Sequence, residues 1–127
     1  MSRQPPAISF GGHTPWAAYS QVEMALWAKC PDLSPLAYRV LFAAMGRHGS
    51  SGHAPFNPGE LAEILATASR ATEGEMVRAR SDSVSRAIES AKRSGFITDE
   101  SNARCLVLPA HAFQKANGAS QPCPVHP

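Results

Sequence analysis

The sequence predicts a mainly α-helical domain of the α+β class, in which three helices form the core and a small β-hairpin follows them. Two segments open with a capping residue and a proline, Ser34 with Pro35 and Asn57 with Pro58, which is typical of helix N-termini. A third segment has apolar residues at helical spacing and stops at Gly95. Two short apolar runs then flank a polar turn, which is the pattern of a hairpin.

The first helix is expected over about residues 35–45. Ser34 is a good N-cap, Pro35 suits the first helical position, and Leu33 can pack onto Tyr38 as a hydrophobic staple. The expected buried stripe consists of Ala37, Val40, Leu41 and Ala44. Residues 19–30 are apolar enough to pack but leave strand and short helix open as alternatives. Residues 46–53 have the composition of a flexible loop.

The second helix is expected to begin at Pro58, with Asn57 as its cap. Glu60 can complete a capping box, and Phe56 can staple onto Leu61. Residues 54–56 can pair as a short strand before this helix. The expected buried stripe consists of Leu61, Ile64 and Leu65. Residues 67–80 contain no sustained stripe, which leaves a loop and a frayed helical extension as alternatives.

The third helix is expected from about residue 82 to 94, with Ser81 or Asp82 as its cap. Lys92 and Arg93 lie in its last turn, where the helix dipole favours cations, and Gly95 suits the left-handed position that ends it. Its apolar face consists of Val84, Ala87, Ile88 and Ala91. Residues 96–98 and 105–108 form the expected hairpin around a turn at 99–102. Residues 110–116 can add a helical turn.

Composition limits the protein's class without defining its partner. The formal charge of +2 is too small to indicate a polyanionic ligand, but residues 78–93 contain five basic side chains against two acidic ones. The chain has three cysteines, an odd number at wide spacing, which favours reduced thiols. No apolar run is long enough to cross a bilayer and no secretory signal is present, so we expect a cytoplasmic protein with no membrane partner. The expected organisation is a flexible segment 1–18, one domain 19–115 and a flexible tail 116–127.

The order of these elements resembles that of winged helix-turn-helix DNA-binding domains. ELAEIL, SVSRAIESAKRSGFI and the following turn and strand are similar to the second helix, recognition helix and wing of that superfamily. Residues that match its pattern are Val84, Ser85, Arg86, Ile88, Lys92, Arg93, Gly95, Phe96 and Ile97. The preceding segment is similar to the front of winged-helix proteins carried by actinobacterial phages, plasmids and integrated elements. The resemblance covers about residues 20–113, and it departs from the pattern in the roughly fourteen residues at 67–80.

The resemblance implies sequence-specific binding of double-stranded DNA by a transcriptional regulator, with the third helix in the major groove. Ser81, Ser83 and Ser85 would face the groove, and Arg86 would contact a guanine through two hydrogen bonds. Phosphate contacts would come from Arg80, Lys92, Arg93 and Arg104, the last of these on the wing. The superfamily also implies a possible homodimer that binds paired half-sites, with both tails and the segment YSQVEMALW at 19–27 as candidate contacts.

Two alternatives remain open at this stage: a winged-helix module that binds proteins and not specific DNA, and the DNA-binding part of a replication initiator. An enzyme is not expected, because the sequence has no phosphate-binding glycine loop, HExxH, CxxC or nucleophile elbow. No cofactor or small-molecule ligand is evident. We assign no metal site, because the spacings of Cys105, His111, Cys123 and His126 match no recognised ligand pattern.

Overall fold

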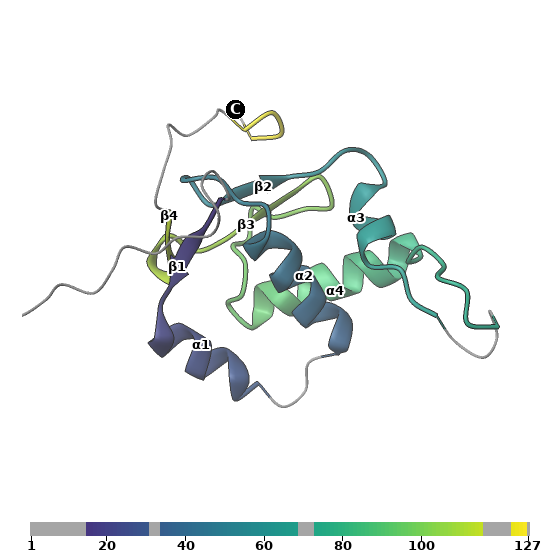
Figure 1. Ribbon diagram of the computed structural model, residues 1–127, viewed down its shortest axis with the longest axis horizontal. Helices are drawn as coiled ribbons and strands as arrows, with labels where there is room; N and C mark the ends of the chain where they lie inside the picture. Colours follow the sequence, from purple (N-terminus) through teal and green to yellow (C-terminus); the bar gives the residue numbers. More distant parts are fainter. Residues whose placement is uncertain (1–14, 31–33, 69–72, 116–122, 127) are drawn as a thin grey trace, which may run out of the picture.

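The computed structural model describes residues 15–30, 34–68, 73–115 and 123–126, and Figure 1 shows their arrangement. In these residues, four α-helices and two two-stranded antiparallel sheets form a mixed α/β fold, which confirms the predicted α+β class. The elements are β1 (Ala17–Tyr19), α1 (Gln21–Ala28), α2 (Pro35–Met45), β2 (His53–Pro55), α3 (Glu60–Ile64), α4 (Ser81–Arg93), β3 (Cys105–Val107) and β4 (Phe113–Lys115). A single 3₁₀ turn, Ala110–Ala112, precedes β4.

The first two helices have side-chain caps. Ser34 Oγ accepts a hydrogen bond from the Ala37 N–H at 3.4 Å, and α2 ends at Met45 as predicted. Leu33, the expected staple residue, lies outside the described residues. The ambiguous segment that precedes α2 is helical over Gln21–Ala28, and Ser20 Oγ accepts from the Glu23 N–H at its start.

The start of α3 corrects the sequence-based prediction. Pro58 and Gly59 form a turn, Gly59 has a left-handed φ of 77°, and the helix begins at Glu60. The predicted capping box is present only in part: the Asn57 N–H donates to Glu60 Oε1 at 2.9 Å, while the N-cap position is Gly59 and has no side-chain hydrogen bond. Ile64, expected in the buried stripe, is 39% exposed.

The third predicted helix, α4, begins one residue earlier than expected. Its N-cap is Arg80, which makes no side-chain cap hydrogen bond, so neither Ser81 nor Asp82 has the predicted capping role. Gly95 has φ of 77° just past the helix end, as the sequence predicts for a left-handed C-terminal residue.

The sheet pairing differs from the predicted hairpin. β3 pairs with β2, fifty residues earlier in the chain, with Ala54 opposite Leu106 and Pro55 opposite Cys105. Residues 96–98 are not a strand, although the Thr98 N–H donates to the Val107 carbonyl oxygen at 2.8 Å. The second sheet pairs β1 with β4, so Tyr19 lies opposite Phe113. Length does not decide the pairing, because β2 is also only three residues long; Phe96 and Ile97 are instead both buried in the core cluster next to the end of α4.

The core lies between α2, α4 and the β2–β3 sheet. All four predicted α2 residues and all four predicted α4 residues are buried. Phe96, which directly follows α4, is fully buried and packs against two aromatic rings: Trp27 at 5.5 Å and Tyr38 at 5.3 Å between ring centroids. Trp27 therefore joins α1 to the end of α4.

The segment between α3 and α4 is closed at its base. The Thr67 N–H donates to the Val77 carbonyl at 2.9 Å, and the Val77 N–H donates back at 2.8 Å. Two residues after Val77, the Ala79 N–H donates to the Ala62 carbonyl oxygen, which holds the end of the segment against α3. In Figure 1 the described parts of 65–80 extend away from the helices at the right of the view.

Both ends of the predicted domain differ slightly from the expected limits. β1 begins at Ala17, two residues before the expected boundary at 19, because it pairs with β4. In the tail, which we expected to be flexible, Cys123–His126 contact the β2–β3 sheet and the turn before β3. Among the described residues, no helix combines the length and apolar character needed to cross a bilayer.

Candidate nucleic-acid interface

Helix α4 has one buried side and one solvent-exposed side. Val84, Ala87, Ile88 and Ala91 face the core and are at most 4% exposed. At 3.6 residues per turn, Asp82, Arg86, Glu89 and Arg93 lie on the opposite side, and all four are exposed. The described residues of the 65–80 segment leave this side open, since the Arg86 side chain is 77% exposed and that of Arg80 is 84% exposed.

The exposed side alternates in charge along the helix. Arg86 Nη2 lies 3.2 Å from Asp82 Oδ2, and Arg80 Nε lies 3.4 Å from Asp82 Oδ1. These pairs are open to water, where an ion pair contributes about 0–1 kcal/mol, so they break readily when a stronger anion approaches. The helix with its N-cap carries Arg80, Arg86, Lys92 and Arg93 against Asp82 and Glu89.

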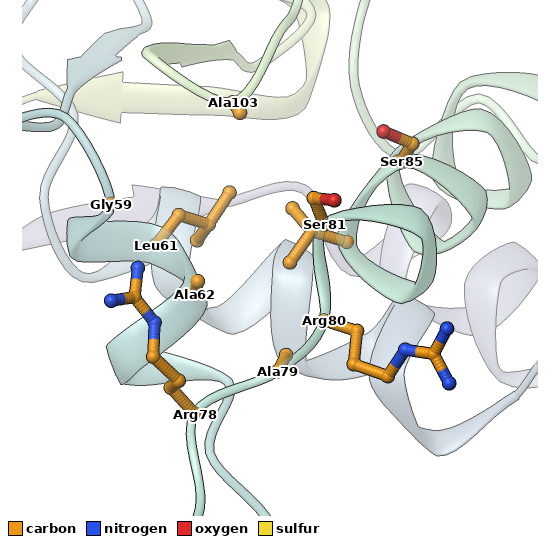
Figure 2. A pocket seen from close by; sticks show the side chains of 10 residues that line it. Gly59, Leu61, Ala62, Arg78, Ala79, Arg80, Ser81, Ser85 and Ala103 are labelled. Atoms are coloured by element: carbon orange, nitrogen blue, oxygen red, sulfur yellow. The ribbon is translucent and has the colours of Figure 1, made fainter.

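A pocket of about 520 Å³ lies beside the first turns of α4 (Figure 2). Its walls come from α3, from the segment that precedes α4, from the first two turns of α4 and from Ala103 in the turn before β3. The lining residues are Gly59, Leu61, Ala62, Arg78, Ala79, Arg80, Ser81, Val84, Ser85 and Ala103. In Figure 2 the guanidinium group of Arg78 extends toward Gly59, and that of Arg80 extends away from it on the other side.

The pocket brings together three of the predicted DNA-binding residues, Arg80, Ser81 and Ser85. Hydroxyl and guanidinium groups are donors to phosphate oxygens, and the N-terminus of a long helix adds a partial positive charge. None of the lining residues is a carboxylate, a histidine or a cysteine, the usual general acids, bases and nucleophiles. The donors that an anion could accept from are the Arg78 guanidinium and the Ser81 and Ser85 hydroxyls, while the rest of the lining is mostly apolar.

The turn at 99–104 is held by side-chain hydrogen bonds. Asn102 Oδ1 accepts from the Arg104 N–H at 2.8 Å and from the Cys105 N–H at 3.1 Å, and buried Ser101 accepts from the Val107 N–H at 2.8 Å. Arg104 Nε donates to the Phe56 carbonyl at 2.8 Å. The residue predicted to contact phosphate from the wing therefore also fixes this turn to the chain after β2.

The remaining predicted site residues lie away from the pocket. Lys92 has a side chain only 18% exposed, paired with Glu89 at 3.3 Å, whereas Arg93 is exposed and donates to Ser90 Oγ. Both belong to the last turn of α4, and Arg93 lies about 18 Å along the helix axis from Ser81 at about 1.5 Å per residue. Ser83 is half-buried on the flank of α4 opposite the pocket, so it contributes less to this surface than Ser81 and Ser85.

An ion pair fixes the chain where α3 begins, next to the pocket. Arg47 Nη1 lies 2.7 Å from Glu60 Oε1, and the Arg47 guanidinium stacks over the Phe56 ring at 4.5 Å. The hydrogen bond from Arg47 and the backbone hydrogen bond from Asn57 lower the pKa of Glu60 to about 2. Arg47 was not among the predicted functional residues, and its role is to position this chain segment.

A second constellation lies on the sheet, where sequence analysis assigned no metal site. Ligand atoms of His53, Cys105, Cys123 and His126 all lie within 4.8 Å of one another. His111, which the sequence offered as a candidate ligand beside Cys105, Cys123 and His126, instead lies 3.5 Å from Glu23. His53 comes next to Cys105 only through the β2–β3 pairing, which no local sequence pattern specifies. The available signal was CPVH at 123–126, a cysteine and a histidine at C-x-x-H spacing.

Comparisons with known proteins add no assignment: no family model, curated protein or solved structure matches the chain.

Proposed function

We propose that the protein is a winged helix-turn-helix regulator that binds double-stranded DNA, with α4 in the major groove and the 99–104 turn as a short wing. The order α2, β2, α3, α4, turn and β3 supports this proposal, as does the pairing of β2 with β3. In this arrangement α3 and α4 are the two helices of the helix-turn-helix. The residues between them replace the usual tight turn with a loop closed by the Thr67–Val77 bridge.

The observation that carries the proposal is the open, polar side of α4. A helix that enters the major groove needs a solvent-exposed face with hydrogen-bond donors at its N-terminal half. Arg86 fits that role, since its side chain is 77% exposed and forms only a weak surface ion pair with Asp82. Arg80, Ser81 and Ser85 surround the pocket and are the candidates for an adjacent phosphate.

The exposure of the last turn refines the predicted phosphate contacts. Arg93 is exposed, whereas Lys92 is mostly covered and paired with Glu89. Arg93 is therefore the stronger candidate for a phosphate contact at the far end of the helix, and Lys92 the weaker one.

Fluorescence anisotropy with duplexes selected from a random library tests the proposal. We expect micromolar or tighter binding at low salt that weakens steeply as salt rises, because phosphate contacts release counterions.

Arg86→Ala should reduce discrimination between selected and random duplexes by about 1–3 kcal/mol. Arg93→Ala should weaken all duplexes alike and lower the salt slope by about one, with Lys92→Ala having less effect. Lys29→Ala, at the exposed residue that follows α1, is the matched control. Absence of duplex binding at low salt would reject the proposal.

The second candidate function is a protein-interaction module with the same fold. Exposed apolar residues on α1 favour it: Val22 is 71% exposed and Leu26, one turn later, is 53% exposed. Pairing of two copies through this face would also give the dimer that reads paired DNA half-sites. Sedimentation of the purified chain tests self-association through this face: a dimer that Leu26→Glu converts to a monomer supports it, and a monomer at all concentrations removes it.

A further inference from the structure

The inner face of β3 belongs to the core, but its outer face is also buried. Leu106 is part of the core cluster, whereas Cys105 and Val107, at 0% and 3% exposure, are buried without belonging to it. In an antiparallel pair, His53 and Cys105 lie diagonally on one face, because His53 is opposite Val107. The residues described near this outer face are those of the C-terminal segment, Cys123–His126, shown in yellow at the top of Figure 1.

Four side chains converge there, and three of the distances between their ligand atoms match those of a tetrahedral metal site. Cys105 Sγ lies 3.6 Å from His53 Nδ1 and 3.6 Å from Cys123 Sγ, and Cys123 Sγ lies 3.7 Å from His126 Nδ1. A tetrahedral ion with bonds of about 2.3 Å to sulfur and about 2.1 Å to nitrogen gives sulfur–sulfur edges of about 3.8 Å and sulfur–nitrogen edges of about 3.6 Å. The three edges agree with these values to within about 0.2 Å.

The surrounding hydrogen bonds orient the ligand atoms. His126 Nε2 lies 2.7 Å from the Glu100 carbonyl oxygen, and because a carbonyl only accepts, Nε2 carries a proton. In the neutral ring this leaves the lone pair of Nδ1 directed toward the cluster, the arrangement usual for a metal-binding histidine. Cys123 Sγ accepts hydrogen bonds from the N–H groups of Val125 at 3.4 Å and His126 at 3.3 Å. Such bonds favour the thiolate, the form that binds a metal.

We propose that His53, Cys105, Cys123 and His126 bind one Zn²⁺ ion, which fixes the C-terminal segment to the outer face of the β2–β3 sheet. A set of two cysteine thiolates and two histidine imidazoles suits tetrahedral zinc among the common metals. The four donor atoms, all within 4.8 Å of one another, are too close for a two-iron cluster, in which cysteines and histidines bind different irons.

The site is structural in kind, because all four positions are filled by protein ligands and none is left for a substrate. Its ligands come from three distant parts of the chain, β2, β3 and the tail, so the ion cross-links them. Through the His126 contact to Glu100, it also restrains the turn at 99–104. The remaining distances between the four ligand atoms are at most 4.8 Å, so ion binding requires side-chain shifts on the order of 1 Å.

Metal analysis of the reduced, DNA-free protein, expressed in zinc-containing medium, tests the site independently of DNA binding. We expect one zinc per chain, and with Co²⁺ in its place, the visible absorption bands of a tetrahedral ion together with thiolate charge-transfer absorption. Cys123→Ser and His126→Asn should each weaken metal affinity by more than the roughly 10- to 100-fold typical of losing an outer hydrogen-bond partner. Both variants leave the helical core intact, so circular dichroism should stay as in the parent.

The chain supplies matched controls for both ligand types. Cys30→Ser removes a thiol whose sulfur lies 3.8 Å from the Leu26 carbonyl, and His111→Asn removes an imidazole beside Glu23. Both should retain full metal content. Amide exchange gives a further readout: the Val125 and His126 N–H groups should exchange slowly with zinc and rapidly after chelation.

Three results would overturn the zinc site. The first is a reduced parent protein without metal and without the Co²⁺ spectrum, which would leave a hydrogen-bonded thiol and imidazole cluster. The second is full metal retention by Cys123→Ser. The third is a Cys105–Cys123 disulfide in the protein as isolated from cells with thiols blocked at lysis, since that bond requires the two sulfurs to approach from 3.6 Å to about 2.05 Å.

Discussion

On α4, the guanidinium of Arg86 lies 3.2 Å from the carboxylate of Asp82, one helical turn earlier, and Arg80 approaches the same carboxylate from the N-cap. Asp82 therefore holds two of the cations that we propose to contact DNA. It also stabilises the folded protein, because a carboxylate in the first turn of a helix interacts favourably with the helix dipole. Asp82 thus stabilises the helix, but its negative charge would repel the phosphates of the DNA that we propose as the ligand.

Asp82→Asn should raise affinity for duplex DNA by roughly fivefold at low salt, because an exposed charge–charge interaction at about 4 Å is worth about 1 kcal/mol. The same change should lower the free energy of unfolding by about 0.3–1 kcal/mol through the lost dipole interaction. Anisotropy titrations and urea unfolding measure the two effects. Glu23→Gln on α1 is the control, and an equal gain of affinity in that variant would indicate a general charge effect.

Arg39 closes the C-terminal end of α3, and its loss should destabilise the fold. Its guanidinium donates to the carbonyl oxygens of Ile64 and Ala66, each at 2.9 Å, and of Leu65 at 3.3 Å. Hydrogen bonds to charged groups contribute about 1.5–3 kcal/mol in favourable cases, so Arg39→Met should cost about 2–3 kcal/mol in urea unfolding. Arg93→Met, exposed on α4, should change stability by less than about 0.5 kcal/mol. Equal effects of the two would exclude this role.

Phe96→Ala should cost about 3–5 kcal/mol, because the ring is fully buried between Trp27 and Tyr38. Phe42→Ala is the matched control: the ring is 63% exposed, and its removal should cost less than about 1 kcal/mol. Thermal or urea unfolding measures both. A small loss for Phe96→Ala would contradict the packing of α1 against the end of α4.

The Arg47–Glu60 pair should make stability depend on pH in the acid range. Glu60 has a pKa of about 2 in the folded protein, below its ordinary value of 4.5, so its contribution is fully present above pH 4.5 and is lost as pH falls through 2. In urea unfolding across this window, Glu60→Gln should show a shallower decline than the parent. Arg47→Met should show the same shallower decline, and Glu63→Gln should keep the parent's profile.

Local chemistry explains which parts of the fold were predictable. Ser34, Pro35 and Gly95 act on their own chain neighbourhood, so the limits of α2 and the end of α4 followed from sequence. The start of α3 did not, because Gly59 in a left-handed turn competes with Asn57 as the cap. The β1–β4 pairing joins residues almost one hundred positions apart, and no local pattern specifies such a partner.

The same distinction separates the two candidate sites. Exposure of Arg86 follows from helical periodicity once Val84 and Ile88 are assigned to the core, so that side of α4 could be predicted. The four-ligand cluster could not, because His53 meets Cys105 only after β2 and β3 pair. A stronger hint lay in β3 itself, whose consecutive apolar residues indicate a strand covered on both faces.

The reciprocal hydrogen bonds between Thr67 and Val77 join the two ends of the long segment between α3 and α4. The relative orientation of these two helices therefore does not depend on how many residues lie between Thr67 and Val77. Residues beyond that closure can be added, removed or exchanged without altering how α4 is presented. This segment is thus an insertion point: a peptide tag or a fluorophore carrier inserted after Gly74 would report on the protein while leaving α4 undisturbed.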